Sequence, residues 1–88
     1  MSTANKYILK YNIHYYSKRY NKWITVPEGY YSDGATGASD IYSEAWWIHD
    51  WLLETKKFND NTNCSWLQAN LIMYDVLQEE GRYVRSYV

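Results

Sequence analysis

The chain has 88 residues, and 9 Lys and Arg against 10 Asp and Glu give it a net charge of −1. This balance argues against broad electrostatic binding to nucleic acid, which needs a basic face. A chain of this length buries only about 60% of its unfolded surface, so its core needs large side chains, and 5 Trp, 11 Tyr and 1 Phe can supply them. We therefore expect one domain over residues 1–88, with residues 1–5 flexible.

The N-terminal third of the chain predicts β-structure. Residues 7–16 (YILKYNIHYY) alternate in part between polar and apolar types and are rich in β-branched and aromatic side chains, which is typical of a strand. SKRYN is a polar turn, and the strand pattern resumes at residues 23–26, so residues 7–26 predict a β-hairpin. Residues 27–29 (PEG) suit a tight turn, and residues 30–32 predict a short third strand.

The next part of the chain predicts a loop followed by a helix. Residues 33–40 (DGATGASD) form a loop of small residues without one large side chain. Residues 43–55 (SEAWWIHDWLLET) are apolar nearly all round, apart from one His-Asp pair, and either Asp40 or Ser43 can cap this helix. A polar, Asn-rich loop over residues 56–63 follows it.

A second helix is expected over residues 64–80. Thr62 or Asn63 can cap its start, and Gly81 suits its end. Residues 82–88 (RYVRSYV) alternate and predict a last edge strand. The expected fold class is therefore α+β, a small antiparallel sheet (the hairpin plus a short third strand) packed with two helices. The apolar residues on the side of the second helix that we expect to pack are Leu67, Leu71, Tyr74 and Leu77.

Three local features favour a cytoplasmic protein over an exported or membrane-bound one. Residues 1–6 have no apolar stretch of the kind that a signal peptide carries, and no run approaches the ~18–20 apolar residues of a membrane span. Cys64 is the lone cysteine, so we interpret it as a small buried hydrophobe. The basic turn at residues 18–22 (KRYNK) is interpreted as solvated, with contact to an anion or nucleic acid as the alternative.

A polar pair, His49 and Asp50, interrupts the apolar surface of the first helix. Neighbouring helical residues point ~100° apart, so we expect at least one of the two to be buried, and a buried polar group needs a hydrogen-bonding partner. The candidate partners are Asp33, Ser32 and Ser39 from the small-residue loop and Asn70 from the second helix.

Two roles are open for Asp33, His49 and Asp50. In a catalytic role, Asp33 orients His49 as a general base, or all three residues bind a divalent metal. In a structural role, they form a hydrogen-bonded lock that ties the loop to the helix. A helical His beside an Asp is more often structural, so we expect the lock, with neither a metal nor a cofactor.

The order of His14, His49-Asp50 and Asp75 also mimics the metal-binding pattern of HD-type phosphohydrolases. Those domains are all-helical and longer, and His14 falls in a strand pattern here, so we do not adopt this assignment. The chain also has no phosphate-binding glycine loop and no GxSxG nucleophile elbow.

Two ordered motifs resemble a family of unknown function that is common in tailed phages and prophages. VPEGYYSDGAT at residues 26–36 resembles the family pattern V-P-x-G-F-x-T-D-x-A-S-x-P. AWWIHDWLL at residues 45–53 resembles an apolar run that ends in H-D-x-L-Y. The resemblance covers roughly residues 10–80, and it implies a phage or prophage origin and a small sheet with two helices.

The resemblance is partial at the polar positions. Asp33, His49 and Asp50 match the family, but Leu53 replaces its Tyr, and Asn70 stands where a later A-D pair has Asp. An Asn carries no charge, so it cannot replace an Asp that binds a metal or acts as a base. The resemblance therefore implies that this member has lost an activity or that the cluster was always structural.

Three functions remain open at this point. We expect a phage or prophage accessory or virion-associated protein that acts through protein–protein contacts or self-association, because Tyr and Trp are enriched at binding hot spots. One alternative is a small hydrolase of cell wall or nucleotides that uses His49 with Asp33 and Asp50. Another is a protein that binds a small ligand, such as a nucleotide, in an aromatic-lined pocket between loop 33–40 and the helices. The expected location is the host cytoplasm or the virion, without membrane contact.

Overall fold

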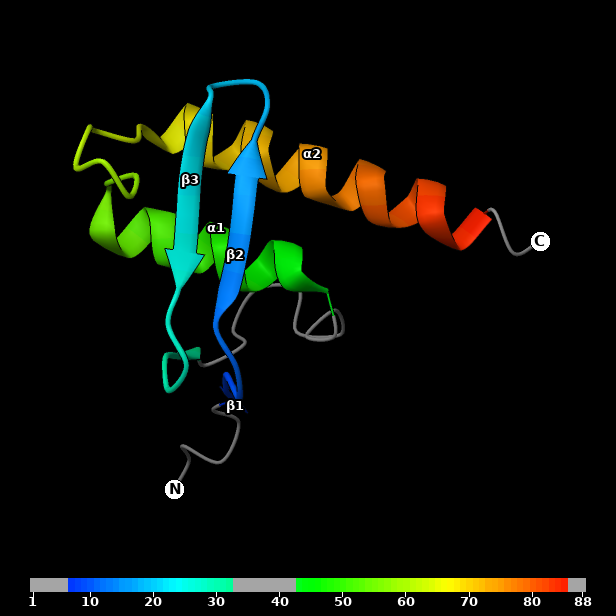
Figure 1. The fold of residues 1–88 in the computed structure, drawn as a ribbon, viewed down its shortest axis with the longest axis horizontal. Coiled ribbons are helices and arrows are strands. Elements are labelled where there is room, and N and C mark those ends of the chain that lie inside the picture. The colour runs from blue at the N-terminus through cyan, green and yellow to red at the C-terminus, as the bar shows by residue number, and fades with distance from the viewer. Residues whose placement is uncertain (1–6, 33–42, 86–88) are drawn as a thin grey trace.

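The computed structural model of the protein describes residues 7–32 and 43–85. β2 and β3 form an antiparallel hairpin, which lies across one side of the helix pair α1 and α2 (Figure 1). The expected α+β class, with an antiparallel hairpin and two helices, is confirmed. The elements are β1 (Tyr7–Ile8), β2 (Ile13–Ser17), β3 (Lys22–Val26), β4 (Tyr31–Ser32), α1 (Glu44–Thr55) and α2 (Trp66–Arg85).

The hairpin turns one face to the helices and the other to solvent. Its register pairs Ile13 with Val26 and Tyr15 with Ile24, and successive side chains on each strand alternate between the two faces. Ile13, Ile24 and Val26 are buried on the helix side. The solvent side carries His14, Tyr16 and Trp23.

The strand expected over residues 7–16 is interrupted, because residues 9–12 separate β1 from β2. In this segment the Asn12 side chain accepts a hydrogen bond from the backbone N–H of Glu28 (2.7 Å), which holds the chain to the turn that follows the hairpin. β4 pairs with β1 in a ladder of its own. The third strand expected beside the hairpin is therefore not found among the described residues.

Helix α1 begins where the sequence predicts. Ser43 is its N-cap, and the Ser43 hydroxyl accepts a hydrogen bond from the Ala45 N–H (3.0 Å). The Glu80 carboxylate, which comes from α2, also covers this end. It accepts from the Ser43 hydroxyl (2.6 Å) and from the Glu44 N–H (3.1 Å). A negative charge at a helix N-terminus is stabilising, so Glu80 of α2 stabilises the first turn of α1.

Helix α2 begins later than expected, because Ser65 and Gln68 cap its N-terminus in place of Thr62 or Asn63. The Ser65 hydroxyl accepts from the Gln68 N–H (3.1 Å), and the Gln68 side chain accepts from the Ser65 N–H (2.9 Å). This reciprocal arrangement is a capping box. The expected caps Thr62 and Asn63 lie in the loop before it.

The same helix also ends later than expected. It continues through Gly81 to Arg85, so the edge strand predicted over residues 82–88 is wrong for residues 82–85, and residues 86–88 lie outside the described part. A glycine inside a helix costs only about 1 kcal/mol relative to alanine. The helix tolerates that cost, and Gly81 is not a stop signal here.

The core lies between the hairpin and the two helices, and it is mainly aliphatic. Phe58 is the one aromatic side chain that is buried among the described residues. The Trp and Tyr side chains lie around the core instead; the Tyr30 ring, for example, meets the edge of Trp51 with ring centroids 5.1 Å apart. Cys64 is buried, as expected. The buried apolar residues are Leu9, Ile13, Ile24, Val26, Ala45, Ile48, Leu52, Phe58, Cys64, Ala69, Ile72 and Val76.

Candidate functional site

The structure brings His49 to the second helix. Its Nε2 lies 2.7 Å from Oδ1 of Asn70, one of the partners expected from the sequence. Asp50 follows His49 on α1 and is half-buried. Asp33 lies outside the described residues. Among the described residues, the contact of His49 therefore joins α1 to α2 through an amide.

The His49 ring has one nitrogen with a partner and one without. With Asn70 Oδ1 as the acceptor, Nε2–H donates and Nδ1 carries the free lone pair. Within the described residues, neither the buried Nδ1 of His49 nor the buried Nε1 of Trp46 has a hydrogen-bond partner. The Trp46 ring meets the His49 ring edge-on at 6.3 Å between centroids. A buried polar atom without a partner costs about 1–3 kcal/mol. The two atoms together offer one donor and one acceptor.

The described residues do not assemble a metal site or a catalytic pair around His49. No three His, Cys, Asp or Glu side chains within residues 7–32 and 43–85 lie close enough to hold a metal ion. His14 contacts the Thr25 hydroxyl (3.1 Å), and Asp75 binds Arg19 (2.6 Å). The HD-like order of residues is thus not gathered in space within that part of the chain. An amide partner also cannot stabilise an imidazolium as a carboxylate does.

Two of the four residues of α2 that were expected to pack are instead exposed. Leu67 and Tyr74 are 59% and 55% exposed, and helix geometry places them opposite Ala69, Ile72 and Val76, which are buried. Leu67, Leu71 and Tyr74 follow the i, i+4, i+7 spacing of a helical apolar face. We call this set, with the 69% exposed Trp66 beside it, the outer stripe of α2.

The sequence contains the signal for the outer stripe, but the signal is ambiguous. α2 carries two apolar stripes of helical period, and the larger side chains belong to the exposed one. The buried stripe includes the small Ala69. Of the four residues predicted to pack, Leu77 does pack against the core. At Leu67 and Tyr74 the prediction therefore took the exposed stripe for the buried one.

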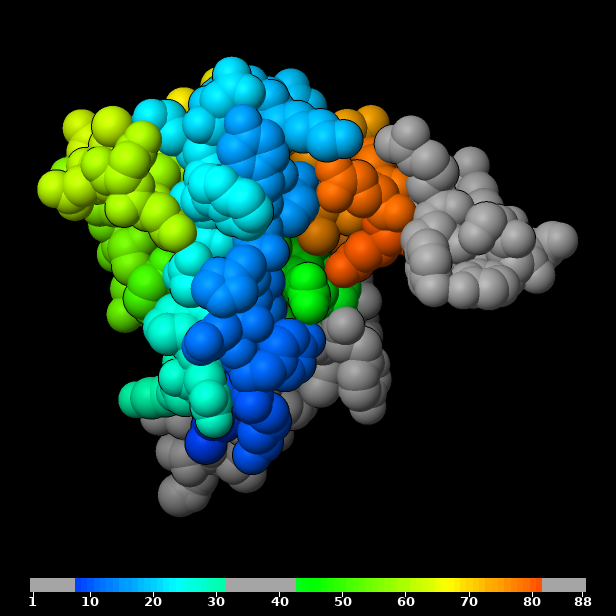
Figure 2. All heavy atoms as spheres, viewed as in Figure 1, coloured from blue at the N-terminus to red at the C-terminus, as the bar shows by residue number. Residues whose placement is uncertain are grey.

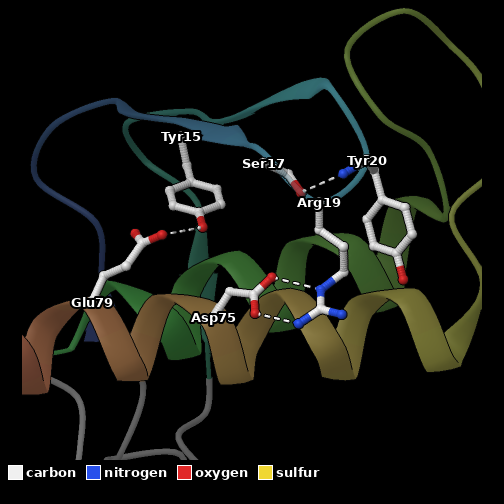
Figure 3. Close-up of polar contacts among 6 residues, drawn as sticks. All are labelled: Tyr15, Ser17, Arg19, Tyr20, Asp75 and Glu79. Carbon is white, nitrogen blue, oxygen red and sulfur yellow. Dashed lines mark hydrogen bonds and ion pairs between the residues drawn. The ribbon is translucent and has the colours of Figure 1, made fainter.

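A hollow of about 420 Å³ lies between the hairpin and α2. Two contacts hold its sides: the Tyr15 hydroxyl donates to Glu79 (3.3 Å), and the Arg19 guanidinium binds Asp75 through two hydrogen bonds (2.8 and 2.6 Å; Figure 3). Burial, together with the nearby Glu79 carboxylate, raises the pKa of Tyr15 to about 12. The lining residues are Tyr15, Lys18, Arg19, Tyr74, Asp75, Gln78 and Glu79.

No family model, curated protein or solved structure matches this chain. Within residues 7–32 and 43–85, no helix is long and apolar enough to cross a membrane. The most prominent exposed apolar feature described above is the outer stripe of α2.

Proposed function

We propose that this protein is a small protein-binding module and, in line with the resemblance of its motifs, an accessory or virion-associated protein of a phage or prophage. The outer stripe of α2 carries the proposal. Trp66, Leu67 and Tyr74 expose more than half of their side-chain surface on one helix. Contiguous exposed apolar surface marks interaction sites, and Trp and Tyr are the residues that dominate binding energy at such sites.

The form of the stripe favours a helical contact with another protein. Apolar residues at i, i+4 and i+7 are the anchors by which a helix lies in a groove or against a second helix. The face opposite them is already occupied by the core, through Ile72 and Val76. One face of α2 therefore packs on the core of the protein, and the opposite face can bind a partner.

Site-specific photocrosslinking in the producing cell tests this proposal. A photoreactive residue replaces Tyr74 on the stripe, or Lys10 as the control, which is an exposed side chain outside α2. We expect a discrete crosslinked product from position 74, its loss when Leu67→Asp is added, and no such product from position 10. Leu67 is exposed, so Leu67→Asp should leave the Tm nearly unchanged.

The mass of the product identifies the partner, which is a second copy of the chain if the product is a dimer. Equal crosslinking patterns from positions 74 and 10 would contradict the proposal, as would a product that Leu67→Asp leaves intact.

A second candidate function is the binding of a small polar ligand beside His49. The observation that favours it is the pair of buried unpartnered atoms, Trp46 Nε1 and His49 Nδ1, because such atoms are the usual anchors of a ligand or an ordered water. Thermal shifts across a panel of nucleotides test it. We expect a ligand that raises the Tm of the natural chain but not that of His49→Phe, and a flat panel would contradict this candidate. The hydrolase alternative has less support, because the described partner of His49 is an amide.

A further inference from the structure

The two edges of the hairpin differ in how their backbone groups are satisfied. In an antiparallel pair, the N–H and C=O groups of alternate residues point away from the partner strand. On β3 the outward groups are those of Trp23 and Thr25, as their hydrogen bonds to Asn59 show. The Asn59 N–H donates to the Trp23 carbonyl (3.0 Å), and the Thr25 N–H donates to the Asn59 side chain (2.9 Å). The loop after α1 therefore covers the β3 edge.

Within residues 7–32 and 43–85, nothing covers the β2 edge in this way. The register pairs His14 with Thr25 and Tyr16 with Trp23, so the backbone groups of His14 and Tyr16 point outward from the opposite edge. Within the described part of the chain, no backbone or side-chain group bonds to them. A strand edge left open in this way is a template for another strand.

The surface of α2 lies beneath and beside the open β2 edge. α2 runs on past β2, away from β3 (Figure 1), and its surface is visible set back beside the strand (Figure 2). The hollow lies at this step, with Tyr15 and Arg19 on the hairpin side and Tyr74 and Gln78 on the helix side. The Tyr15–Glu79 and Arg19–Asp75 contacts fix its walls (Figure 3).

We infer that the β2 edge and the hollow together bind an extended peptide segment of a partner protein, which adds a third strand to the hairpin. The backbone of the segment would bond to His14 and Tyr16. Its alternate side chains would point toward α2, where a large apolar one would rest on the exposed ring of Tyr74. Binding by strand addition takes its affinity from the backbone and its specificity from the alternate side chains.

A second copy of this chain does not suit the same edge. Two copies paired through β2 would be related by a twofold axis perpendicular to the sheet. Because α2 projects past β2 (Figure 1), each copy would drive its projecting helix under the hairpin of the other, into the layer that α1 occupies. A lone extended segment needs only the room of one strand. This inference adds to the proposed function a binding surface that shares Tyr74 with the outer stripe, and Leu67, which does not line the hollow, separates the failure of the one from the failure of the other.

A selection with displayed seven-residue peptides tests the inference. The library is selected on the natural full chain alone, and the enriched peptides are then measured on His14→Pro, which removes an outward N–H that bonds to nothing in the described part of the chain. We expect enriched peptides with a large apolar residue at alternate positions. These peptides should bind His14→Pro about tenfold or more weakly, because the lost bond leaves a peptide carbonyl unpaired. The matched control, His14→Ala, keeps the backbone N–H and should bind within about twofold of the natural chain.

A second measurement covers the case in which His14→Pro unfolds. The best peptide is N-methylated at alternate residues in two complementary patterns, and only one pattern should abolish binding, since only one set of N–H groups faces β2. Leu67→Asp, the variant that tests the proposed function, should leave peptide binding intact. No enriched peptide, peptides that bind His14→Pro and His14→Ala alike, or two N-methyl patterns of equal effect would each overturn the inference.

Discussion

At the scale of single residues, most polar side-chain contacts of this protein cannot be predicted from the sequence. His49 was expected to need a partner, and Asn70 was among the candidates, so this contact could be predicted as one of several. Arg19 and Asp75 lie 56 residues apart in the sequence, and nothing in either local pattern indicates their pairing. Such pairs are created by the packing of elements and are invisible before it is known.

Tyr15 gives a prediction at this scale. Its pKa is raised from an ordinary value of about 10 to about 12, first by burial and then by Glu79. A raised pKa means that the folded state favours the protonated phenol. The stabilisation is complete below pH 10 and is lost as the pH rises from about 10 to about 12. We expect the stability of the natural chain to fall more steeply in that window than that of Tyr15→Phe, as measured by denaturant melts at a series of pH values. Parallel curves for the two proteins would contradict this assignment.

At the scale of elements, the first helix and the hairpin could be predicted because their signals are local. Ser43 caps α1 next to its first turn, and the hairpin strands flank a polar turn. The predictions for α2 failed where two local signals competed. Thr62 and Asn63 are plausible caps, yet Ser65 forms the capping box with Gln68. Leu67 and Ala69 each belong to an apolar stripe of helical period, and only Ala69 is buried. Only the position of α1 decides between the two faces of α2.

Gly81 gives a prediction for this helix. It lies inside α2, and a Cβ added there would meet nothing within 4 Å. Alanine loses less backbone entropy than glycine when it becomes helical, so Gly81→Ala should stabilise the protein by about 0.5–1 kcal/mol. Thermal or urea unfolding measures the change. A loss of stability would show that residue 81 does not hold a helical conformation in solution.

At the scale of the whole molecule, the hairpin and the helices share one core, so they should unfold together. Ile24 is fully buried on the hairpin face that meets the helices. Truncation of such a side chain leaves a cavity and costs about 2–5 kcal/mol. We expect Ile24→Ala to lower stability by this amount, with one transition seen alike by far- and near-ultraviolet circular dichroism. Two separate transitions for Ile24→Ala would contradict the shared core.

The open edge of the hairpin could not have been predicted at any of these scales alone. Both strands have the same alternating pattern, and which edge stays free depends on where Asn59 lies after α1 has packed. The hollow also depends on how the elements pack, because it lies where α2 extends past β2. Surfaces that form where one element extends past another are therefore the features of this molecule that are hardest to predict from its sequence.

The Glu80 carboxylate at the start of α1 also has a consequence for the order of folding. During synthesis, residues 43–55 leave the ribosome well before residue 80, so the first helix emerges with its own cap, Ser43, but without the Glu80 carboxylate. The contacts of Glu80 with Ser43 and Glu44 can form only when the part of α2 around Glu80 has formed and docked. We therefore expect these contacts to form late, so that substitutions at Glu80 speed unfolding while leaving the folding rate almost unchanged, as stopped-flow folding and unfolding kinetics would measure.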